Sequence, residues 1–248
     1  MTFSLFVFQL PKEEKIINSS PFCIKMITFF KVAKIDHTVV HDNQRLLKSD
    51  KKKLPCIEED GKIYSDSRLI IQRYKQKGTD LDKKLNSNDA ALSVAFQRMV
   101  EEHTYWYIVC SRWIRNWDYV SKTYFYMIPW ILSPIKLFIG WNMKKQLYSV
   151  GTTRLSYDEQ YLLVKQDLIA LETLLQDSKT VFYFSSATPT NLDIVVFSFV
   201  FALVCTPFND RAATYAKHFC PKVMKLISEM LSTYFPIEWI YFSSVFNK

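Results

Sequence analysis

The hydrophobic pattern of the sequence changes near residue 80, and this change limits the folds open to the chain more than any other feature. Up to residue 78, short apolar runs that are typical of strands alternate with stretches of helical period. From Asp89 onward, apolar residues recur at helical spacings. A mixed unit followed by a helical unit accounts for both patterns. We therefore expect an α/β domain over residues 1–80 and an all-helical domain over residues 86–248.

The first half has the expected order strand, helix, strand, irregular basic loop, hairpin, helix. Residues 3–10 (FSLFVFQL) are apolar at most positions, as expected for a strand buried on both faces. Residues 21–34 place their apolar side chains on one helical face, and residues 37–41 predict a second strand. Asp60-Gly61 predicts the turn of a hairpin, and Gly78 the end of the helix that follows it.

The second half is expected to consist of long helices. A stripe of residues at alternating spacings of four and three predicts a helix with one buried face: Leu92, Phe96, Met99, His103, Trp106, Cys110 and Trp113. Further helices are expected over residues 157–175, 192–206 and 222–233. Thr190 and Asp193 have the spacing of a capping box at the start of the apolar helix from residue 192, which we expect to be surrounded by protein. On the stripe, His103 is expected to be a buried, hydrogen-bonded residue rather than a catalytic one.

Residues 117–150 interrupt this helical pattern. Their core, MIPWILSPIKLFIGW, is strongly apolar, but it is too short for a membrane span and is interrupted by Pro129, Pro134 and Lys136. Two interpretations remain open for this insertion. It is a helical segment packed on the second domain, or residues 125–141 form a surface that contacts a protein partner or a membrane.

The composition excludes several classes of function. With 4 glycines in 248 residues, the chain has no glycine-rich cradle for phosphate or dinucleotide binding. Its 5 cysteines are scattered without a C-x-x-C pair and its 4 histidines lack metal-ligand spacing, so we expect neither a disulfide framework nor a metal site. The net charge of +8 includes a lysine cluster at residues 48–53, which indicates a solvated loop, or an anion-binding role for one of these lysines, rather than a nucleic-acid surface. We also expect the protein to reside in a reducing compartment. The first ten residues are not expected to be a signal peptide.

The segment Ser19-Ser20-Pro21-Phe22-Cys23 is the first candidate for chemistry. Pro21 suits the first turn of a helix, and Ser20 just before it is a natural N-cap. The same geometry stabilises an anion, because backbone amides and the positive helix end face it. Lowering a thiol pKa by about two units requires roughly 2.7 kcal/mol, which a hydroxyl hydrogen bond and a helix end together supply. Structural capping and thiolate stabilisation both remain open for Ser20.

Two further segments flank the predicted hairpin. In Lys53-Leu54-Pro55, a cis peptide bond before Pro55 would leave the backbone of Leu54 free to pair with an extended ligand, although an ordinary trans turn is the simpler reading. In Ser65-Asp66-Ser67, either Asp66 or Ser67 caps the next helix, and the same groups suit a ligand carboxylate and ammonium.

Together, these motifs resemble the amino-terminal half of a glutathione transferase. The runs SPFCIKM, KLPCIEEDGKIYSDSRLI and FQRMVEEHTYWYIVCSRW are similar to the Failed axon connections (Fax) and metaxin-like branch of that superfamily. The resemblance covers roughly residues 3–235 except the insertion. It implies a thioredoxin-like first domain, an all-α second domain, and glutathione bound as a substrate by the first, with a hydrophobic co-substrate between the two.

The resemblance also implies roles for single residues. Ser20 would be the thiol-activating hydroxyl, and Leu54 with cis-Pro55 would present a strand-like backbone to the cysteinyl unit. Asp66 and Ser67 would hold the γ-glutamyl end of glutathione, and Lys53 would reach its glycyl carboxylate. Cys23 matches the second cysteine of a redox C-x-x-C motif, for which packing is favoured over reactivity. Ser185 and Ser186 depart from the family, because most relatives have a glycine there.

Three hypotheses for function follow. The first is a cytoplasmic transferase that conjugates glutathione to hydrophobic electrophiles. The second is a non-catalytic, Fax-like or metaxin-like adaptor whose insertion contacts a protein partner or associates with a membrane. The third, thiol–disulfide exchange through Cys23, is weakened by the serine at position 20. A homodimer is expected from the family alone.

Overall fold

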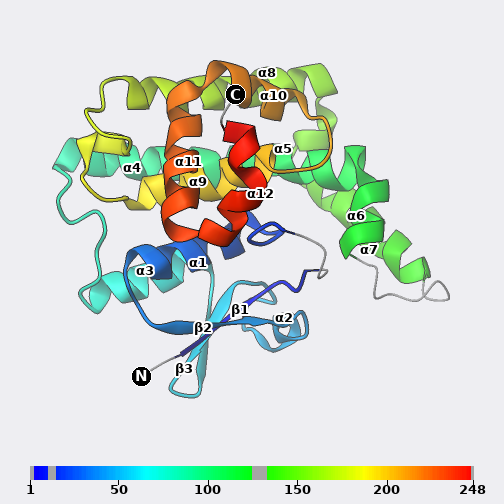
Figure 1. Cartoon of the computed structure of the whole chain (residues 1–248). Coiled ribbons are helices and arrows are strands. Elements are labelled where there is room, and N and C mark those ends of the chain that lie inside the picture. The colour runs from blue at the N-terminus through cyan, green and yellow to red at the C-terminus, as the bar shows by residue number, and fades with distance from the viewer. Residues whose placement is uncertain (1–2, 11–14, 125–132, 247–248) are drawn as a thin grey trace.

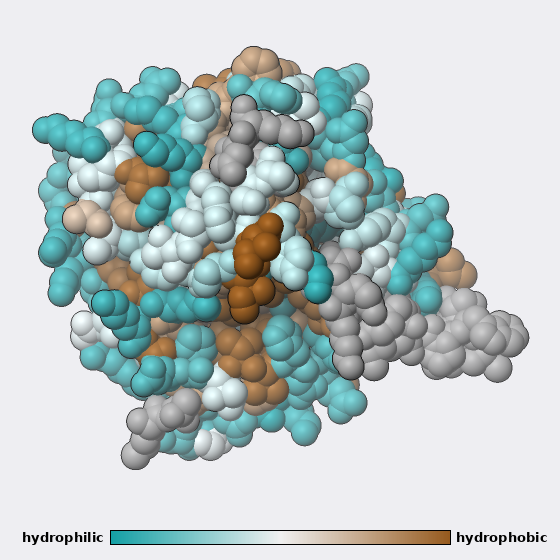
Figure 2. Space-filling model, in the orientation of Figure 1, coloured by the Kyte–Doolittle hydropathy of each residue, from teal (hydrophilic) through white to brown (hydrophobic). Residues whose placement is uncertain are grey.

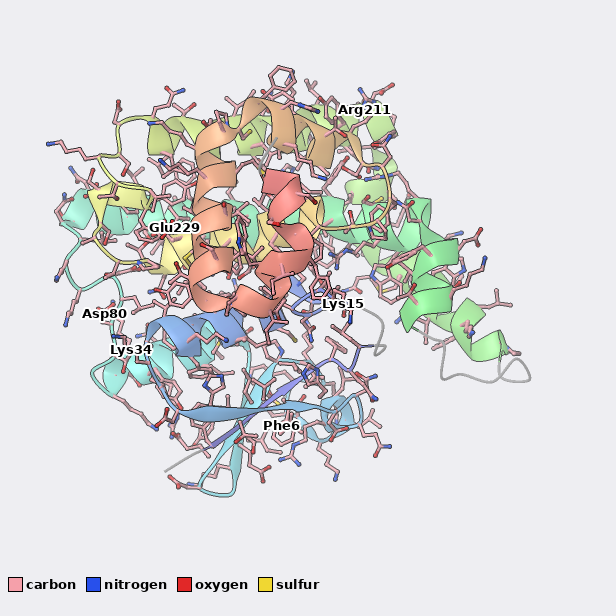
Figure 3. All side chains as sticks on the ribbon, in the orientation of Figure 1. Phe6, Lys15, Lys34, Asp80, Arg211 and Glu229 are labelled. Carbon is pink, nitrogen blue, oxygen red and sulfur yellow. The ribbon has the colours of Figure 1, made fainter. Side chains whose placement is uncertain are left out.

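The computed structural model describes residues 3–10, 15–124 and 133–246. The amino-terminal part is a small sheet with helices on one face, and the carboxyl-terminal part is a stack of helices, as predicted (Figure 1). Figure 3 places Phe6 in the sheet layer and Glu229 and Arg211 in the helical layer. The predicted division into residues 1–80 and 86–248 stays a prediction.

Among the residues described, the sheet has four strands in the order β2-β1-β3-β4. The bounds are β1 Phe3–Val7, β2 His37–His41, β3 Cys56–Glu59 and β4 Lys62–Ser65. β2 runs parallel to β1, because helix α1 (Pro21–Val32) connects them, whereas β3 and β4 form the predicted antiparallel hairpin. Leu5 and Val7 of β1 are fully buried.

Helices α1 and α3 (Ser67–Gln76) lie between the sheet and the helical part (Figure 1). The basic loop, which we expected to be irregular, contains a one-turn helix, α2 (Arg45–Lys48). A single turn has no apolar periodicity, so the pattern did not indicate it.

The helical part begins with one long helix that contains two π-helical turns. Its segments are α4 Ser87–Met99, a π turn Val100–Thr104, α5 Tyr105–Cys110 and a second π turn Ser111–Arg115. The remaining helices are α6 Trp117–Tyr124, α7 Ser133–Ser149, α8 Tyr157–Gln176, α9 Asn191–Val204, α10 Arg211–Phe219, α11 Pro221–Tyr234 and α12 Pro236–Phe246, with short 3-10 turns at Thr152–Arg154 and Tyr183–Ser185.

Of the predicted buried stripe on the long helix, Cys110 is buried, but the phase of the stripe as a whole is wrong. Leu92 is exposed, whereas Ser93, Thr104 and Ser111 are buried. The inner face combines large apolar residues such as Val100 and Tyr107 with these small polar ones, of which Thr104 donates to Asp167 of α8 and Ser111 donates to Asp210 before α10. Each π turn also bonds residue i to i+5, which shifts the inner face along the sequence.

Helix α9 is the central helix of the structure. All its residues from Leu192 to Val204 are buried, as the apolar run predicted, and its start has the predicted capping box between Thr190 and Asp193. It packs against α1 from the sheet domain and against α4, α10 and α11. The insertion begins with α6 and ends with α7; the predicted contact surface 125–141 falls partly on residues 125–132, which lie outside the described residues.

Candidate functional site

Ser20 caps the start of α1, as predicted. The Cys23 amide donates to Ser20 Oγ at 3.4 Å, Pro21 occupies the first turn, and the Ser20 amide donates to Asn18 Oδ1 at 3.1 Å. Ser20 is half-buried. Since the hydroxyl accepts from Cys23, its own hydrogen remains able to donate to an anion at this helix end.

Cys23 lies beneath this cap and is fully buried as a free thiol. Burial raises the pKa of the Cys23 thiol to about 12, although the Ser20 hydroxyl and the Phe8 backbone act in the opposite direction. A thiol with this pKa carries almost no thiolate at neutral pH, so Cys23 packs as a small apolar residue in this state.

The Leu54–Pro55 peptide bond is cis, as the family resemblance implied and not the trans turn that the dipeptide alone favoured, and both residues are buried. Within the described residues, no loop or turn hydrogen bond uses the amide or carbonyl of Leu54. Ser49 holds the loop in place, because its hydroxyl donates to the Lys53 carbonyl at 3.0 Å and accepts from the Lys53 amide at 2.9 Å. The side chain of Lys53 is exposed to solvent.

Asp66 and Ser67 open helix α3. Asp66 has a φ of 75°, a left-handed conformation that is unfavourable for a residue with a side chain, and its carboxylate accepts from the amides of Arg68 and Leu69. The capping role of Asp66 is therefore confirmed. Ser67 is buried, and its hydroxyl accepts from Lys25 Nζ at 3.3 Å.

The topology brings the predicted segments to one end of the sheet. Cys56 pairs with Ser65 across the β3–β4 hairpin, so Pro55 and Asp66, the next residue on each strand, are neighbours. Cys56 also pairs with Phe6, near the end of β1 from which the chain leads into α1. The contact between Lys25 and Ser67 joins α1 to the start of α3. The starts of both helices and the cis peptide thus share one edge.

Sequence reasoning missed a buried ion pair behind this edge. Lys25 of α1 and Glu101 of the first π turn are each about 1% exposed, and Lys25 Nζ lies 2.5 Å from Glu101 Oε1. Burial lowers the pKa of Lys25, whereas the charge of Glu101 raises it. Glu101 also pairs with Arg98 at 3.1 Å. Since Lys and Glu are seldom buried without a partner, the only available signal was a lysine inside an otherwise apolar helical run.

A second missed residue, Arg112, connects the site to α9. Its guanidinium is buried and donates to the carbonyl of Ser19, next to Ser20, and to the carbonyl of Ala202 on α9. Aromatic rings line the boundary between α1 and the helical part. The centroid of the Phe22 ring lies 4.9 Å from that of Tyr105 and 5.1 Å from that of Phe199, both in edge-on contacts. These rings offer an apolar wall beside the start of α1.

His103 is hydrogen-bonded, as predicted, but the prediction that it is buried was wrong, since its side chain is 49% exposed. Its Nδ1 lies 2.7 Å from Asp167 Oδ2, and this contact raises the pKa of His103. The shifted phase of the helix turns His103 outward and the neighbouring Thr104 inward, where Thr104 also donates to Asp167.

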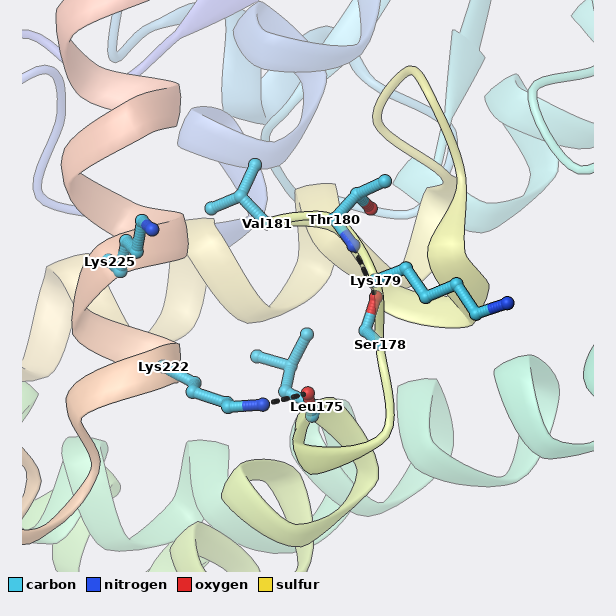
Figure 4. Close-up of a pocket in the computed structure, with 7 residues that line it drawn as sticks. All are labelled: Leu175, Ser178, Lys179, Thr180, Val181, Lys222 and Lys225. Atoms are coloured by element: carbon cyan, nitrogen blue, oxygen red, sulfur yellow. Dashed lines mark hydrogen bonds between the residues drawn. The ribbon is translucent and has the colours of Figure 1, made fainter.

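Two of the cavities in the structure lie away from this edge. One, of about 290 Å³, lies between the end of α8 and α11, where Lys222 donates to the Leu175 carbonyl (Figure 4). The other, of about 360 Å³, is lined by Tyr161, Arg211 and Phe219 among others. No predicted site residue lines either one. The described residues contain no group of His, Cys, Asp or Glu side chains suited to a metal.

Comparisons with known proteins agree with this architecture. Residues 21–118 match the family model described as the glutathione S-transferase N-terminal domain, and residues 164–230 match the glutathione S-transferase C-terminal domain. A glutathione transferase of Phanerochaete chrysosporium shares the fold, with a TM-score of 0.67 at 12% identity over 94% of this chain and 98% of that one. A glutathione S-transferase of Methylobacillus flagellatus, solved with glutathione bound, has a TM-score of 0.60 at 14% identity over 93% and 95% of the two chains. The chain belongs to the glutathione S-transferase superfamily.

Within this superfamily, the chain falls in the Fax and metaxin-like branch. It is 27% identical to Failed axon connections of Drosophila melanogaster over 95% of this chain and 59% of that protein. It is 22% identical to human metaxin-2 over 85% of this chain and 81% of that protein. It is also 34% identical to an isoprene-epoxide glutathione S-transferase of Rhodococcus, over 40% of this chain and 43% of that enzyme. The chain therefore spans less than two thirds of the length of Fax and of the Rhodococcus enzyme.

Proposed function

We propose that the chain binds glutathione at the edge of the sheet where α1 and α3 begin. The observation that carries this proposal is the convergence of two capped helix starts beside the Leu54–Pro55 peptide. Helix starts bind anions, and glutathione carries anionic groups at both ends and a thiol between them. The glutathione-bound neighbour in Methylobacillus flagellatus and the similarity to the Rhodococcus enzyme support the same ligand.

In this proposal each predicted residue has one role. Ser67 and Asp66 hold the γ-glutamyl carboxylate and ammonium, the backbone of Leu54 pairs with the cysteinyl unit, and Lys53 reaches the glycyl carboxylate. Lys25 supports the role of Ser67: an ammonium can only donate, so the Ser67 hydroxyl accepts from it and keeps its own hydrogen for the ligand.

Ser20 would stabilise the glutathione thiolate through a donated hydrogen bond. The thiol proton passes to water, and the sulfur then forms a bond to the electrophilic carbon of a hydrophobic compound, whose leaving group or opened epoxide oxygen takes the electron pair. The apolar wall of Phe22 and Tyr105 would hold that compound beside the sulfur. Proximity and thiolate stabilisation would supply the acceleration.

The test is calorimetry with glutathione, followed by a conjugation assay on an aromatic halide and an epoxide. Ser20→Ala should retain glutathione binding within a few-fold and lose about 10²-fold or more in kcat/KM, as expected for loss of a charge-stabilising hydrogen bond. Ser156→Ala is the matched control, because Ser156 caps α8 far from the site and its loss should leave activity unchanged. No glutathione binding by the unmodified chain would refute the proposal.

The second candidate is a non-catalytic adaptor. The similarity to Failed axon connections and metaxin-2 favours it. Glutathione binding without turnover of either electrophile would select this function over the transferase. The weaker hypothesis of thiol–disulfide exchange requires Cys23 to become accessible, against the burial seen here.

A cytoplasmic location and a homodimer also belong to this proposal. All five cysteines are free, which supports a reducing compartment. Light scattering on the purified chain measures the homodimer directly; a mass of 29.3 kDa would show a monomer.

A further inference from the structure

Helix α7 carries large apolar side chains and lysines on one outward face. Leu137, Phe138 and Trp141 are 69%, 64% and 58% exposed. Lys144, Lys145 and Tyr148, also exposed, follow Trp141 at spacings of three, four and seven residues. These spacings place all six on one side of the helix, which we call the outer face of α7.

The opposite side of α7 packs against the protein. Leu147 is fully buried in a cluster with Val109 and Cys110. Gly140 lies so close to Trp117 of α6 that an added Cβ would approach its ring to 3.2 Å. The inner side of α7 therefore already packs against the protein, through residues other than those of the outer face. α6 and α7 together project from the helical layer (Figure 1), and hydrophilic and apolar residues lie side by side on this projection (Figure 2).

The charge on α7 has a single sign. The helix contains Lys136, Lys144 and Lys145 and no Asp or Glu. Lys145 Nζ lies 5.4 Å above the Trp141 ring, and Arg154 stacks on Tyr148 at 4.8 Å, so cations accompany the aromatic rings. Lysine is depleted in the cores of protein–protein interfaces, whereas long lysine side chains and Trp or Tyr rings are favoured at membrane interfaces.

We propose that the outer face of α7 docks on an anionic phospholipid bilayer. The eight residues from Leu137 to Lys144 span roughly 10 Å along the helix. With its Leu137 end inserted, Phe138 and Trp141 reach the acyl boundary while Lys144 and Lys145 remain at the phosphate level. In the described part of the chain, no helix meets the length and apolarity needed to cross a bilayer. This proposal is independent of glutathione binding.

The experiment is co-sedimentation of the full chain with phosphatidylcholine vesicles that contain or lack phosphatidylserine. We expect binding to the anionic vesicles that weakens at high salt. Lys144→Gln with Lys145→Gln should reduce the partition coefficient by roughly 25-fold, since each lysine near an anionic surface contributes about fivefold. The matched control is Lys83→Gln with Lys84→Gln, which removes the same charge from two exposed lysines outside α7 and should change binding little.

The apolar part is tested with Phe138→Ser combined with Trp141→Ser. These side chains are exposed, so the variant should fold, which circular dichroism checks. Binding to anionic vesicles should fall at least tenfold, whereas Phe219→Ser, which removes an aromatic ring that is 65% exposed on α10, should bind as the unmodified chain does. Equal binding to neutral and anionic vesicles, unchanged binding after either α7 double substitution, or no binding of the unmodified chain overturns the proposal.

Discussion

The buried pair of Lys25 and Glu101 predicts a strongly non-additive pair of substitutions. Glu101→Leu leaves the Lys25 ammonium in a fully buried site where it still donates to the Ser67 hydroxyl but has lost its ion-pair partner. Removing one partner of such a pair costs about 3–5 kcal/mol of unfolding free energy. Lys25→Met should cost less, near 3 kcal/mol, because Arg98 still pairs with the Glu101 carboxylate at 3.1 Å.

The double substitution Lys25→Met with Glu101→Leu removes both charges and fills the space with apolar atoms. We expect it to lie within about 1 kcal/mol of the unmodified chain or above it, since apolar replacements of buried ion pairs are commonly neutral or stabilising. The coupling energy between the two sites should therefore exceed about 3 kcal/mol.

Urea unfolding followed by circular dichroism measures the four free energies of this cycle. Lys75→Met is the matched control, because Lys75 pairs with Asp80 at the surface and its loss should cost less than about 1 kcal/mol. Additive losses, with a double variant about as unstable as the sum of its parts, would refute the account of Lys25 as a buried charge that depends on Glu101.

Three further predictions use other measurements. A thiol reagent at neutral pH should find no fast-reacting cysteine among the five, because all are buried and burial raises the pKa of Cys23 to about 12; five thiols should react after denaturation, and one fast native reaction would contradict this. The hydrogen bond to Asp167 raises the pKa of His103. The stabilisation that the protonated His103 gives to the fold is therefore complete below pH ~6.5 and is lost as the pH rises through the raised pKa. The difference in melting temperature between the unmodified chain and His103→Gln should accordingly be larger at pH ~6 than at pH ~9, and a pH-independent difference would argue against it. Asp193→Ala should lose about 3 kcal/mol or more in urea unfolding, since its buried carboxylate accepts from two backbone amides and one hydroxyl, whereas Ser156→Ala, at an exposed capping box, should lose about 1 kcal/mol; similar losses would contradict the role of burial.

Features governed by local rules were predictable from the sequence. Ser20 before Pro21, and Thr190 three residues before Asp193, are helix starts because capping depends on neighbouring residues only. The α9 run was recognisable because a helix that is apolar all round must be buried. Helices α10 and α12 went unpredicted, although Pro236 marks the first turn of α12.

Features that depend on distant residues were not predictable. Lys25 and Glu101 lie 76 residues apart, so neither shows its partner in the sequence. Arg112 likewise bonds to carbonyls 93 and 90 residues away. The predicted phase of the long helix was wrong because hydrophobic periodicity counts large apolar residues, whereas the buried face also holds small polar ones. Thr104 and Ser111 are buried because they donate to Asp167 and Asp210, 63 and 99 residues away.

The π turn at Val100–Thr104 determines which way the rest of its helix faces. Each such turn accommodates one more residue than a regular α-helical turn. One extra residue in a regular α-helix would rotate every later side chain by about 100° around the axis, and the wider π turn absorbs most of that rotation. Arg112 therefore still reaches the Ser19 carbonyl. The contact between the helical layer and the segment before α1 thus depends on the number of residues in one helical turn as much as on the identity of the residues in contact.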